Sequence, residues 1–309
     1  MRWTGVARES RWSGLSVSTT LTNPSTRPGL RLPGRVTLTA GRDDVPVRRI
    51  RLGLVATAEP EDPDAARRLV QYHQVPIAGR FVVPAGRRRA VDFALPLPWE
   101  TPVTVFGAVP LMSLRTGLRT EVSVDLDRDV GAMVPVLVHP LPVQQHILAA
   151  LDTLGFVLRQ AGLVQGRLPG VEQALPLHQR LGYWVAPLYA GPMTELELVF
   201  VANSAGLEVL LWLDRRLSLT GISHQSISRF RLWHTGAERR DWVATVDGWL
   251  RMAINRHAAA AAHSDWSARI TESAHVSRRP DHPVAPGYGL GGTAGGPGIG
   301  GGGGGGDGT

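Results

Sequence analysis

Apolar and polar residues alternate along much of the first 140 residues, in short runs that end at glycine or proline. Val17, Thr19 and Leu21 form one such run, and residues 50–56 form a longer one with arginines at positions 49 and 51. A period of two is expected for a strand with one buried face. Regular short strands separated by turn residues predict an antiparallel β-sandwich.

The pattern changes after His139-Pro140-Leu141-Pro142, which we interpret as the boundary between two lobes. Residues 143–155 place apolar side chains at helical spacing and predict a helix that stops at Gly155. Strand-like alternation then resumes. The run 209–213 is apolar at every position, which is typical of a strand covered on both faces.

A second helix is predicted over residues 241–262. Asp241 can cap its first turn, and Trp242, Val246, Trp249 and Leu250 belong to an apolar stripe at helical spacing. Such a stripe favours packing on the helix's own domain over the alternative, a partner-binding helix. Beyond residue 263 glycine becomes dominant, which predicts a flexible tail because little apolar surface can be buried.

Together these patterns predict a mainly β fold class of two antiparallel β-sandwich lobes, with a short boundary helix and a C-terminal helix. The predicted parts are an N-terminal sandwich over 1–140, a C-terminal sandwich that begins with a helix over 141–236, a C-terminal helix over 237–263 and a disordered glycine-rich tail over 264–309.

Charge narrows the range of partners. The 309 residues carry a net charge of +7, and the sequence contains arginine but no lysine. The arginines are scattered among acids, so no specific nucleic-acid site is predicted. The densest run, Arg87-Arg88-Arg89, is interpreted as a solvated turn. Arg2, Trp3, Arg11 and Trp12 leave open a weak association with an anionic membrane, although a frayed terminus is the favoured interpretation.

The absence of cysteine rules out a disulfide framework and fits a reducing compartment. No run reaches the ~18–20 apolar residues that cross a bilayer, and residues 1–14 lack the apolar region of a secretory signal. The sequence therefore predicts a cytoplasmic protein.

Catalytic motifs are missing from the sequence: there is no phosphate-binding loop with lysine, no nucleophile elbow and no zinc-binding helix motif. We predict no enzyme activity and no cofactor. Asp125, Asp127 and Asp129 alternate and could bind a divalent cation. The favoured interpretation is that they pair with arginines such as Arg115. A carboxylate–arginine arrangement of this kind could also fix the relation between the two lobes.

Several stretches, taken in order over roughly residues 17–255, resemble the bacterial sporulation-control (Spo-zero-M) family. The matching stretches are Thr20-Leu21-Thr22-Asn23-Pro24, Arg27-Pro28-Gly29, Leu32-Pro33-Gly34-Arg35-Val36, Ile50-Arg51-Leu52-Gly53-Leu54, Leu95-Pro96-Leu97-Pro98-Trp99-Glu100-Thr101-Pro102-Val103-Thr104, Leu114-Arg115-Thr116-Gly117-Leu118, Val124-Asp125-Leu126-Asp127-Arg128-Asp129, Val138-His139-Pro140-Leu141-Pro142, Ala150-Leu151-Asp152-Thr153-Leu154-Gly155-Phe156, Glu195-Leu196-Glu197-Leu198 and Leu213-Asp214-Arg215-Arg216. The resemblance implies an arrestin-like fold whose two lobes present concave faces to peptide or protein partners. It implies no catalytic residues.

The chain departs from the family at Leu175-Pro176-Leu177-His178-Gln179-Arg180-Leu181, where the family usually carries two acidic residues. If those acids recognise a partner, the partner of this chain differs.

The function predicted from the resemblance is a regulatory adaptor in developmental or cell-cycle control that acts by protein–protein interaction. The alternatives are a peripheral membrane adaptor that binds anionic lipid and, less favoured, an enzyme that depends on a divalent metal. The candidate inter-lobe or partner-contact residues are Arg115, Asp125, Asp127, Asp129 and Arg215. The protein partner and the oligomeric state are open.

Overall fold

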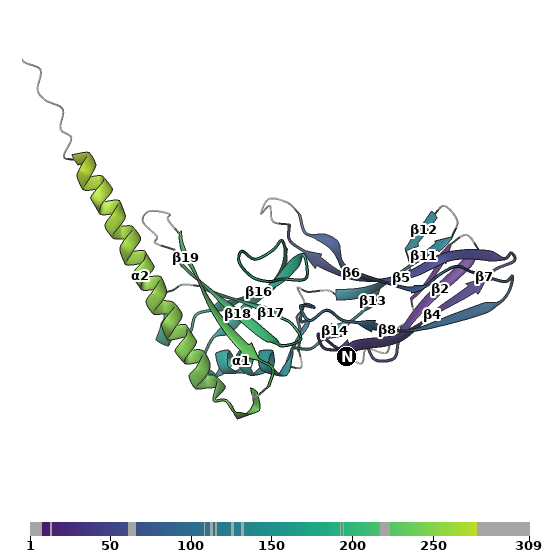
Figure 1. The fold of residues 1–309 in the computed structure, drawn as a ribbon, viewed down its shortest axis with the longest axis horizontal. Helices are drawn as coiled ribbons and strands as arrows, with labels where there is room; N and C mark the ends of the chain where they lie inside the picture. The colour runs from purple at the N-terminus through teal and green to yellow at the C-terminus, as the bar shows by residue number, and fades with distance from the viewer. Residues whose placement is uncertain are drawn as a thin grey trace, which may run out of the picture. The chain divides into compact units, whose positions relative to one another are not determined.

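The computed structural model describes residues 8–12, 14–60, 66–107, 109–111, 114, 116–124, 127–130, 133–191, 193, 195–216, 223–235 and 237–276. Residues up to Ser264 form one compact unit, and residues from Asp265 onward form a second. The first unit contains two lobes, which meet between β14 (Leu137–Val138) and α1 (Pro142–Thr153) (Figure 1). No helix in the described part of the chain is long and apolar enough to cross a bilayer.

The first lobe is a sandwich of two antiparallel sheets. One sheet has the strand order β1 (Arg8–Trp12), β2 (Leu15–Leu21), β4 (Arg31–Ala40), β8 (Arg88–Pro96). The other has the order β12 (Asp127–Val130), β11 (Thr116–Val124), β5 (Val45–Ala58), β6 (Arg68–Ala78), with β13 (Val134–Pro135) paired to β11 and β7 (Phe81–Val83) paired to β5.

Side chains that alternate along these strands fill the space between the two sheets. Leu38 on β4 and Leu52 and Leu54 on β5 are fully buried, as the period of two predicts. The hydroxyls of Thr19 on β2 and Thr120 on β11 meet between the sheets, 2.6 Å apart. The two polar groups satisfy each other, so their burial inside an apolar layer is not penalised.

Short strands complete the first lobe near the second. β3 (Ser25–Thr26) pairs in parallel with β14, and β9 (Val105–Phe106) pairs with β10 (Val109–Pro110).

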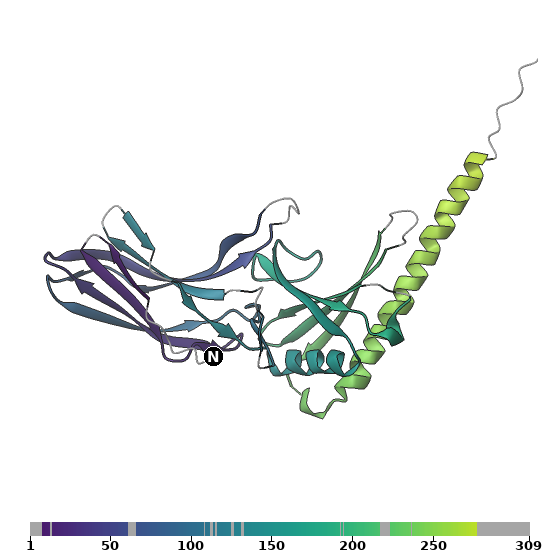
Figure 2. The same ribbon diagram turned by 180° about the vertical axis from the view of Figure 1, so that it is seen from behind.

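In the described residues, the second lobe is built on one five-stranded antiparallel sheet in sequence order, and not on the two packed sheets of the predicted second sandwich. Its strands are β15 (Val157–Gln165), β16 (Leu177–Trp184), β17 (Glu195–Ala202), β18 (Gly206–Arg216) and β19 (Ser223–Trp233). Helix α1 and the first turns of α2 (Trp242–Val276), which contribute Trp242 to Ala253, pack on one side of this sheet, which we call the inner face (Figures 1 and 2). Short 3₁₀ turns occur at Pro187–Tyr189 and Ala237–Arg239.

Helix α1 confirms the predicted boundary helix. The Gln144 side chain accepts a hydrogen bond from the Leu141 backbone N–H at 2.8 Å, so a buried amide fixes the first turn. Ile147 and Leu151 face the core. Gly155 adopts φ +86° just after the helix, in the left-handed region that favours glycine, and this ends the helix as predicted.

Helix α2 begins as predicted and runs further than predicted. The Asp241 carboxylate accepts a hydrogen bond from the Ala244 N–H at 3.0 Å, and the Trp249 ring stacks on Phe230 of β19. The helix continues to Val276 instead of ending near 263. Alanines at 258–262 favour helix and no proline or glycine follows before residue 280, so the sequence gives no stop signal at 263. The predicted tail beyond Val276 lies outside the described residues.

The apolar cores of the two lobes are continuous. Buried side chains from the sandwich, α1, the five-stranded sheet and α2 form one contiguous cluster. The predicted covering of residues 209–213 on both faces is seen at Leu210, which packs against Leu168 on the side opposite α1 and α2. We call that side the outer face.

Candidate functional site at the junction of the lobes

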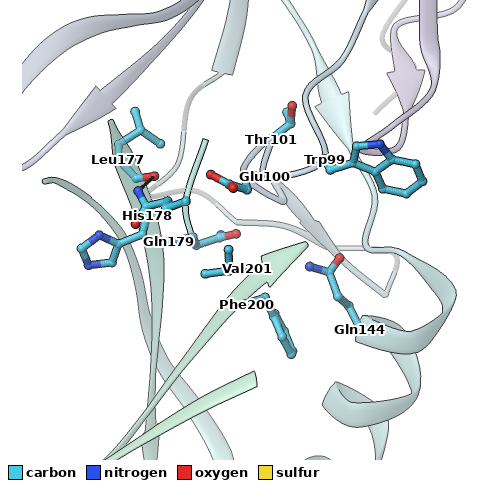
Figure 3. Close-up of a pocket in the computed structure, with 10 residues that line it drawn as sticks. Trp99, Glu100, Thr101, Gln144, Leu177, His178, Gln179, Phe200 and Val201 are labelled. Atoms are coloured by element: carbon cyan, nitrogen blue, oxygen red, sulfur yellow. Dashed lines mark hydrogen bonds between the residues drawn. The ribbon is translucent and has the colours of Figure 1, made fainter. Parts of the chain in front are cut away.

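The two lobes are joined by a polar clamp between two segments far apart in sequence. The segment after β8, residues 97–104, comes from the first lobe. The other segment, residues 166–179, runs from the end of β15 into β16 of the second lobe. Figure 3 shows side chains from both segments, together with Gln144 of α1 and Phe200 and Val201 of β17.

Glu100 forms the first half of the clamp. Its two carboxylate oxygens accept hydrogen bonds from consecutive backbone N–H groups, Ala174 at 2.7 Å and Leu175 at 2.8 Å. Hydrogen bonds to a charged acceptor are shorter and stronger than those between neutral groups. The carboxylate therefore holds the chain just before β16 against the first lobe.

Gln179 forms the second half of the clamp. Its side-chain oxygen accepts a hydrogen bond from the Val103 N–H at 2.9 Å, and its amide nitrogen donates to the Val103 carbonyl at 2.8 Å. Because Val103 is buried, water cannot easily replace Gln179 as the hydrogen-bond partner of its backbone N–H and carbonyl. A glutamine can supply both a donor and an acceptor here, whereas glutamate offers only acceptors.

A second contact joins the lobes through backbone groups. Glu59, at the end of β5, donates its N–H to the Leu163 carbonyl at 2.7 Å and accepts from the Gln165 N–H at 2.8 Å. Arg68 on β6 also donates to the Gln165 side chain at 2.9 Å. These hydrogen bonds join the end of β5 in the first lobe to β15 in the second lobe.

The segment 166–176 is itself organised around one buried side chain. The amide nitrogen of Gln173 lies within hydrogen-bond distance of the carbonyls of Gly166, Leu175 and Leu177, and its oxygen accepts from the Leu168 N–H. Glu100 of the first lobe holds the end of the segment 166–176, so the position of this segment depends on both lobes.

The described side chains leave little free space at the junction. The cavity lined by Trp99, Glu100, Gln144 and Gln179 has a volume of about 10 Å³. This is no more than the space that one water molecule needs. Between the described residues, this cavity has room for about one water molecule.

The outer face of the second-lobe sheet carries a repeated set of side chains. Arg159 lies over the Trp184 ring, 5.0 Å from its centroid, and forms an ion pair with Glu195 at 3.3 Å. Arg180 lies over Trp212 at 5.6 Å and pairs with Glu197 at 3.8 Å. Both sets cross neighbouring strands on the same face.

A groove of about 300 Å³ lies beside the second set, lined by Pro169, Arg180, Glu195, Glu197, Trp212, Leu213 and Ile227. Four large apolar side chains on this face are exposed: Val157 at 60%, Trp184 at 54%, Ile227 at 44% and Trp233 at 73%. Val157 and Trp184 are cross-strand neighbours, whereas Ile227 and Trp233 lie on β19, three strands from Trp184. Exposed apolar side chains that share one face mark interaction surfaces more often than isolated ones do.

His178 lies between the clamp and the outer face. Burial, reinforced by the nearby Arg180 guanidinium, lowers the pKa of His178 to about 4. The imidazole is therefore neutral near pH 7, and its Nε2 can accept the hydrogen bond from Arg180 Nε at 3.4 Å.

None of the residues predicted from the sequence as inter-lobe or partner contacts has a described side chain. Arg115 and Asp125 lie outside the described residues. Asp127 and Asp129 lie on β12 and Arg215 on β18, but only their backbone is described. Their predicted roles in lobe contact or partner binding stay predictions. Among the side chains that the structure does describe, no group of three or more acidic, histidine or cysteine residues could hold a metal ion.

Sequence reasoning missed Glu100 and Gln179 as functional residues. Both lie in stretches singled out on other grounds, Glu100 in a matching stretch of the resemblance and Gln179 in the departure from it. They are 79 positions apart, and Gln179 contacts a residue 76 positions away, so no local pattern could pair them. The proline-rich, turn-forming composition of 95–104 was the available signal.

The fold and the clamp define a class: a two-lobed, mainly β protein whose lobes are joined by polar side chains from both lobes. The SpoOM protein family model matches residues 12–217, more than half of the chain, and the protein belongs to this family. The resemblance predicted from the sequence motifs is thereby confirmed.

Two comparisons agree with this assignment. The chain is 27% identical over 208 residues to the sporulation-control protein spo0M of Bacillus subtilis (strain 168). The aligned region covers 65% of this chain and 75% of that protein. It also superimposes on the crystal structure of Spo0M from Bacillus subtilis with a TM-score of 0.65 and 22% identity, over 80% of this chain and all of that one. The predicted mainly β, arrestin-like fold class is confirmed.

Proposed function

We propose that this protein is a regulatory adaptor in developmental control, acting in the way the name of its Bacillus relative indicates, and that it works by binding protein partners and not by catalysis. The observation that carries the proposal is the outer face of the second-lobe sheet. Trp184 and Trp233 are more than half exposed there, beside arginines held in ion pairs.

Tryptophan and arginine are the residue types that most often dominate binding energy in protein interfaces. The guanidinium of Arg159 is already fixed between Trp184 and Glu195, so little side-chain entropy is lost when a partner covers it. The clamp supports this role because it holds the segment 166–176, whose Pro169 forms one wall of the groove.

The test compares the face variant W184A/W233A with L188A, a control that removes an equally exposed apolar side chain away from this face. Leu188 is 75% exposed. Each tagged full-length variant is expressed in place of the wild-type protein in the organism from which the protein comes. The proteins that cross-link to it are quantified during growth and development. We expect the face variant to lose specific partners and to impair development while L188A keeps both. Equal partner recovery and normal development in both strains would contradict the proposal.

A further inference from the structure

One end of the first lobe combines exposed apolar residues with arginines. It consists of residues 42–46, between β4 and the start of β5, and residues 82–89, which connect β7 to β8. We call these residues the tip. Figure 1 shows β7 and the neighbouring ends of β2 and β4 at the end of the sandwich opposite β14.

Backbone hydrogen bonds hold the two loops of the tip side by side. The Gly86 N–H donates to the Gly41 carbonyl at 2.7 Å, and the Ala40 N–H donates to the Arg87 carbonyl at 3.0 Å. The Ala85 N–H donates to the Asp44 carboxylate at 2.7 Å. The tip is therefore a formed surface, and its side chains are presented from a fixed backbone.

The apolar part of the tip faces solvent. Pro46 and Val82 are cross-strand neighbours, and both are exposed. Val82 is 49% exposed, and Pro84 and Ala85 after it are also exposed. These side chains are small and aliphatic. The ring at this end, Phe81, is half-buried and covered by the Arg89 guanidinium at 4.1 Å.

Arginines surround this apolar patch. Arg42, Arg87, Arg88 and Arg89 are all exposed, and none of them forms an ion pair with a described acidic side chain. The described acids of the tip are Asp43 and Asp44. Further along the same sheet the pattern differs, because Arg35 is paired with Asp92 at 2.5 Å.

We propose that the tip is a docking surface for a membrane that contains anionic lipid. Val82, Pro84 and Ala85 enter the headgroup region, and Arg42 and Arg87–Arg89 bind lipid phosphates. An apolar patch flanked by basic side chains combines the two contributions that hold peripheral proteins at anionic membranes. The surface lies on the first lobe, so it is separate from the protein-binding face proposed for the second.

The exposed chemistry favours lipid over nucleic acid. Surfaces that bind single-stranded nucleic acid combine basic side chains with exposed aromatic rings on which bases stack. The described tip offers aliphatic side chains between its arginines, and its phenylalanine is already covered by Arg89.

The test measures binding of the full-length protein to vesicles by flotation. The vesicles contain phosphatidylcholine with phosphatidylglycerol, or phosphatidylcholine alone. The tip variant is R87Q/R88Q/R89Q. The matched control is R27Q/R239Q/R256Q, which removes the same charge from exposed positions elsewhere. A rescue variant, R87K/R88K/R89K, restores the positive charge at the tip, and V82S tests the apolar contact without changing charge.

We expect the tip variant to lower the partition coefficient on anionic vesicles by roughly 100-fold, which corresponds to about 3 kcal/mol at about 1.4 kcal/mol per tenfold and about 1 kcal/mol per arginine. The control and the lysine variant should retain most of the binding, and V82S should weaken it. The proposal is overturned if the wild-type protein does not bind anionic vesicles, binds phosphatidylcholine alone equally well, or loses as much binding in the control as in the tip variant. Tighter binding of the tip to duplex or single-stranded DNA than to vesicles would overturn it in favour of nucleic acid. All four variants change exposed side chains, and thermal unfolding monitored by circular dichroism confirms that each is folded.

Discussion

Removing the clamp should cost a large part of the protein's stability. The variant E100A deletes a carboxylate that accepts two backbone hydrogen bonds, and Q179A deletes an amide that satisfies both backbone groups of Val103. The two side chains touch different backbone groups, so each can be removed separately and in combination.

The size of the effect follows from the contacts. A hydrogen bond to a charged group contributes about 1.5–3 kcal/mol, and the lower end applies to Glu100 because its surroundings are partly exposed. E100A should therefore cost about 2–3 kcal/mol. Q179A leaves the buried N–H and carbonyl of Val103 without their partner, which should cost about 2 kcal/mol. The double variant should lose about 4–5 kcal/mol, against the ~5–15 kcal/mol typical of a whole domain.

The assay is unfolding in urea, monitored by tryptophan fluorescence and by circular dichroism. The chain has nine tryptophans, and the described ones include Trp99 in the first lobe and Trp184 and Trp212 in the second. We expect one transition for the wild-type protein and one at a lower urea concentration for E100A/Q179A, because the continuous apolar core and the contact between β5 and β15 still couple the lobes. The control D92N removes an exposed carboxylate that is also paired with an arginine, and it should leave the midpoint unchanged within error. A double variant that unfolds at the wild-type urea concentration would refute the reasoning.

Three further predictions concern single features of the fold. Because the pKa of His178 is lowered to about 4, below the ~6.5 of an unfolded chain, the unfolded state binds the proton more readily. The free energy of unfolding should therefore fall by about 2 kcal/mol between pH 6.5 and 4 after allowance for solvent screening, and H178Q should flatten this dependence in urea titrations at a series of pH values. G29A should cost about 2 kcal/mol in thermal unfolding, because Gly29 has φ +77° and an added Cβ would lie 2.8 Å from the Trp99 ring; an unchanged midpoint would argue against strain at that turn. T19V should cost about 1–2 kcal/mol by leaving the buried Thr120 hydroxyl alone, and adding T120V should recover part of the loss; a strictly additive double variant would contradict the paired hydroxyls.

The elements that the sequence predicted well are those with local signals. The start of α2 follows from the capping side chain of Asp241, and the end of α1 follows from Gly155. The run 209–213 indicated burial on both faces because both faces of one strand were apolar. In each case the residues that decide the structure are neighbours in the chain.

The functional junction depends on contacts that no local pattern contains. Glu100 binds backbone N–H groups, and any residue other than proline offers such a group, so residue types cannot identify its partners. Gln179 was noticed only as a departure from a family pattern, although its donor and acceptor fit Val103 from both sides. The predicted end of α2 near residue 263 was wrong, because the change in composition there contains no residue that stops a helix.

Distances measured by double electron–electron resonance test most directly whether Glu100 and Gln179 hold the two lobes in one arrangement. The protein has no cysteine, so T39C on β4 and V157C on β15 can carry the only two spin labels, both at exposed positions. We predict one narrow distance distribution for the otherwise wild-type chain and a clearly broader one when E100A and Q179A are added. Distributions of equal width and position in the two proteins would contradict the claim.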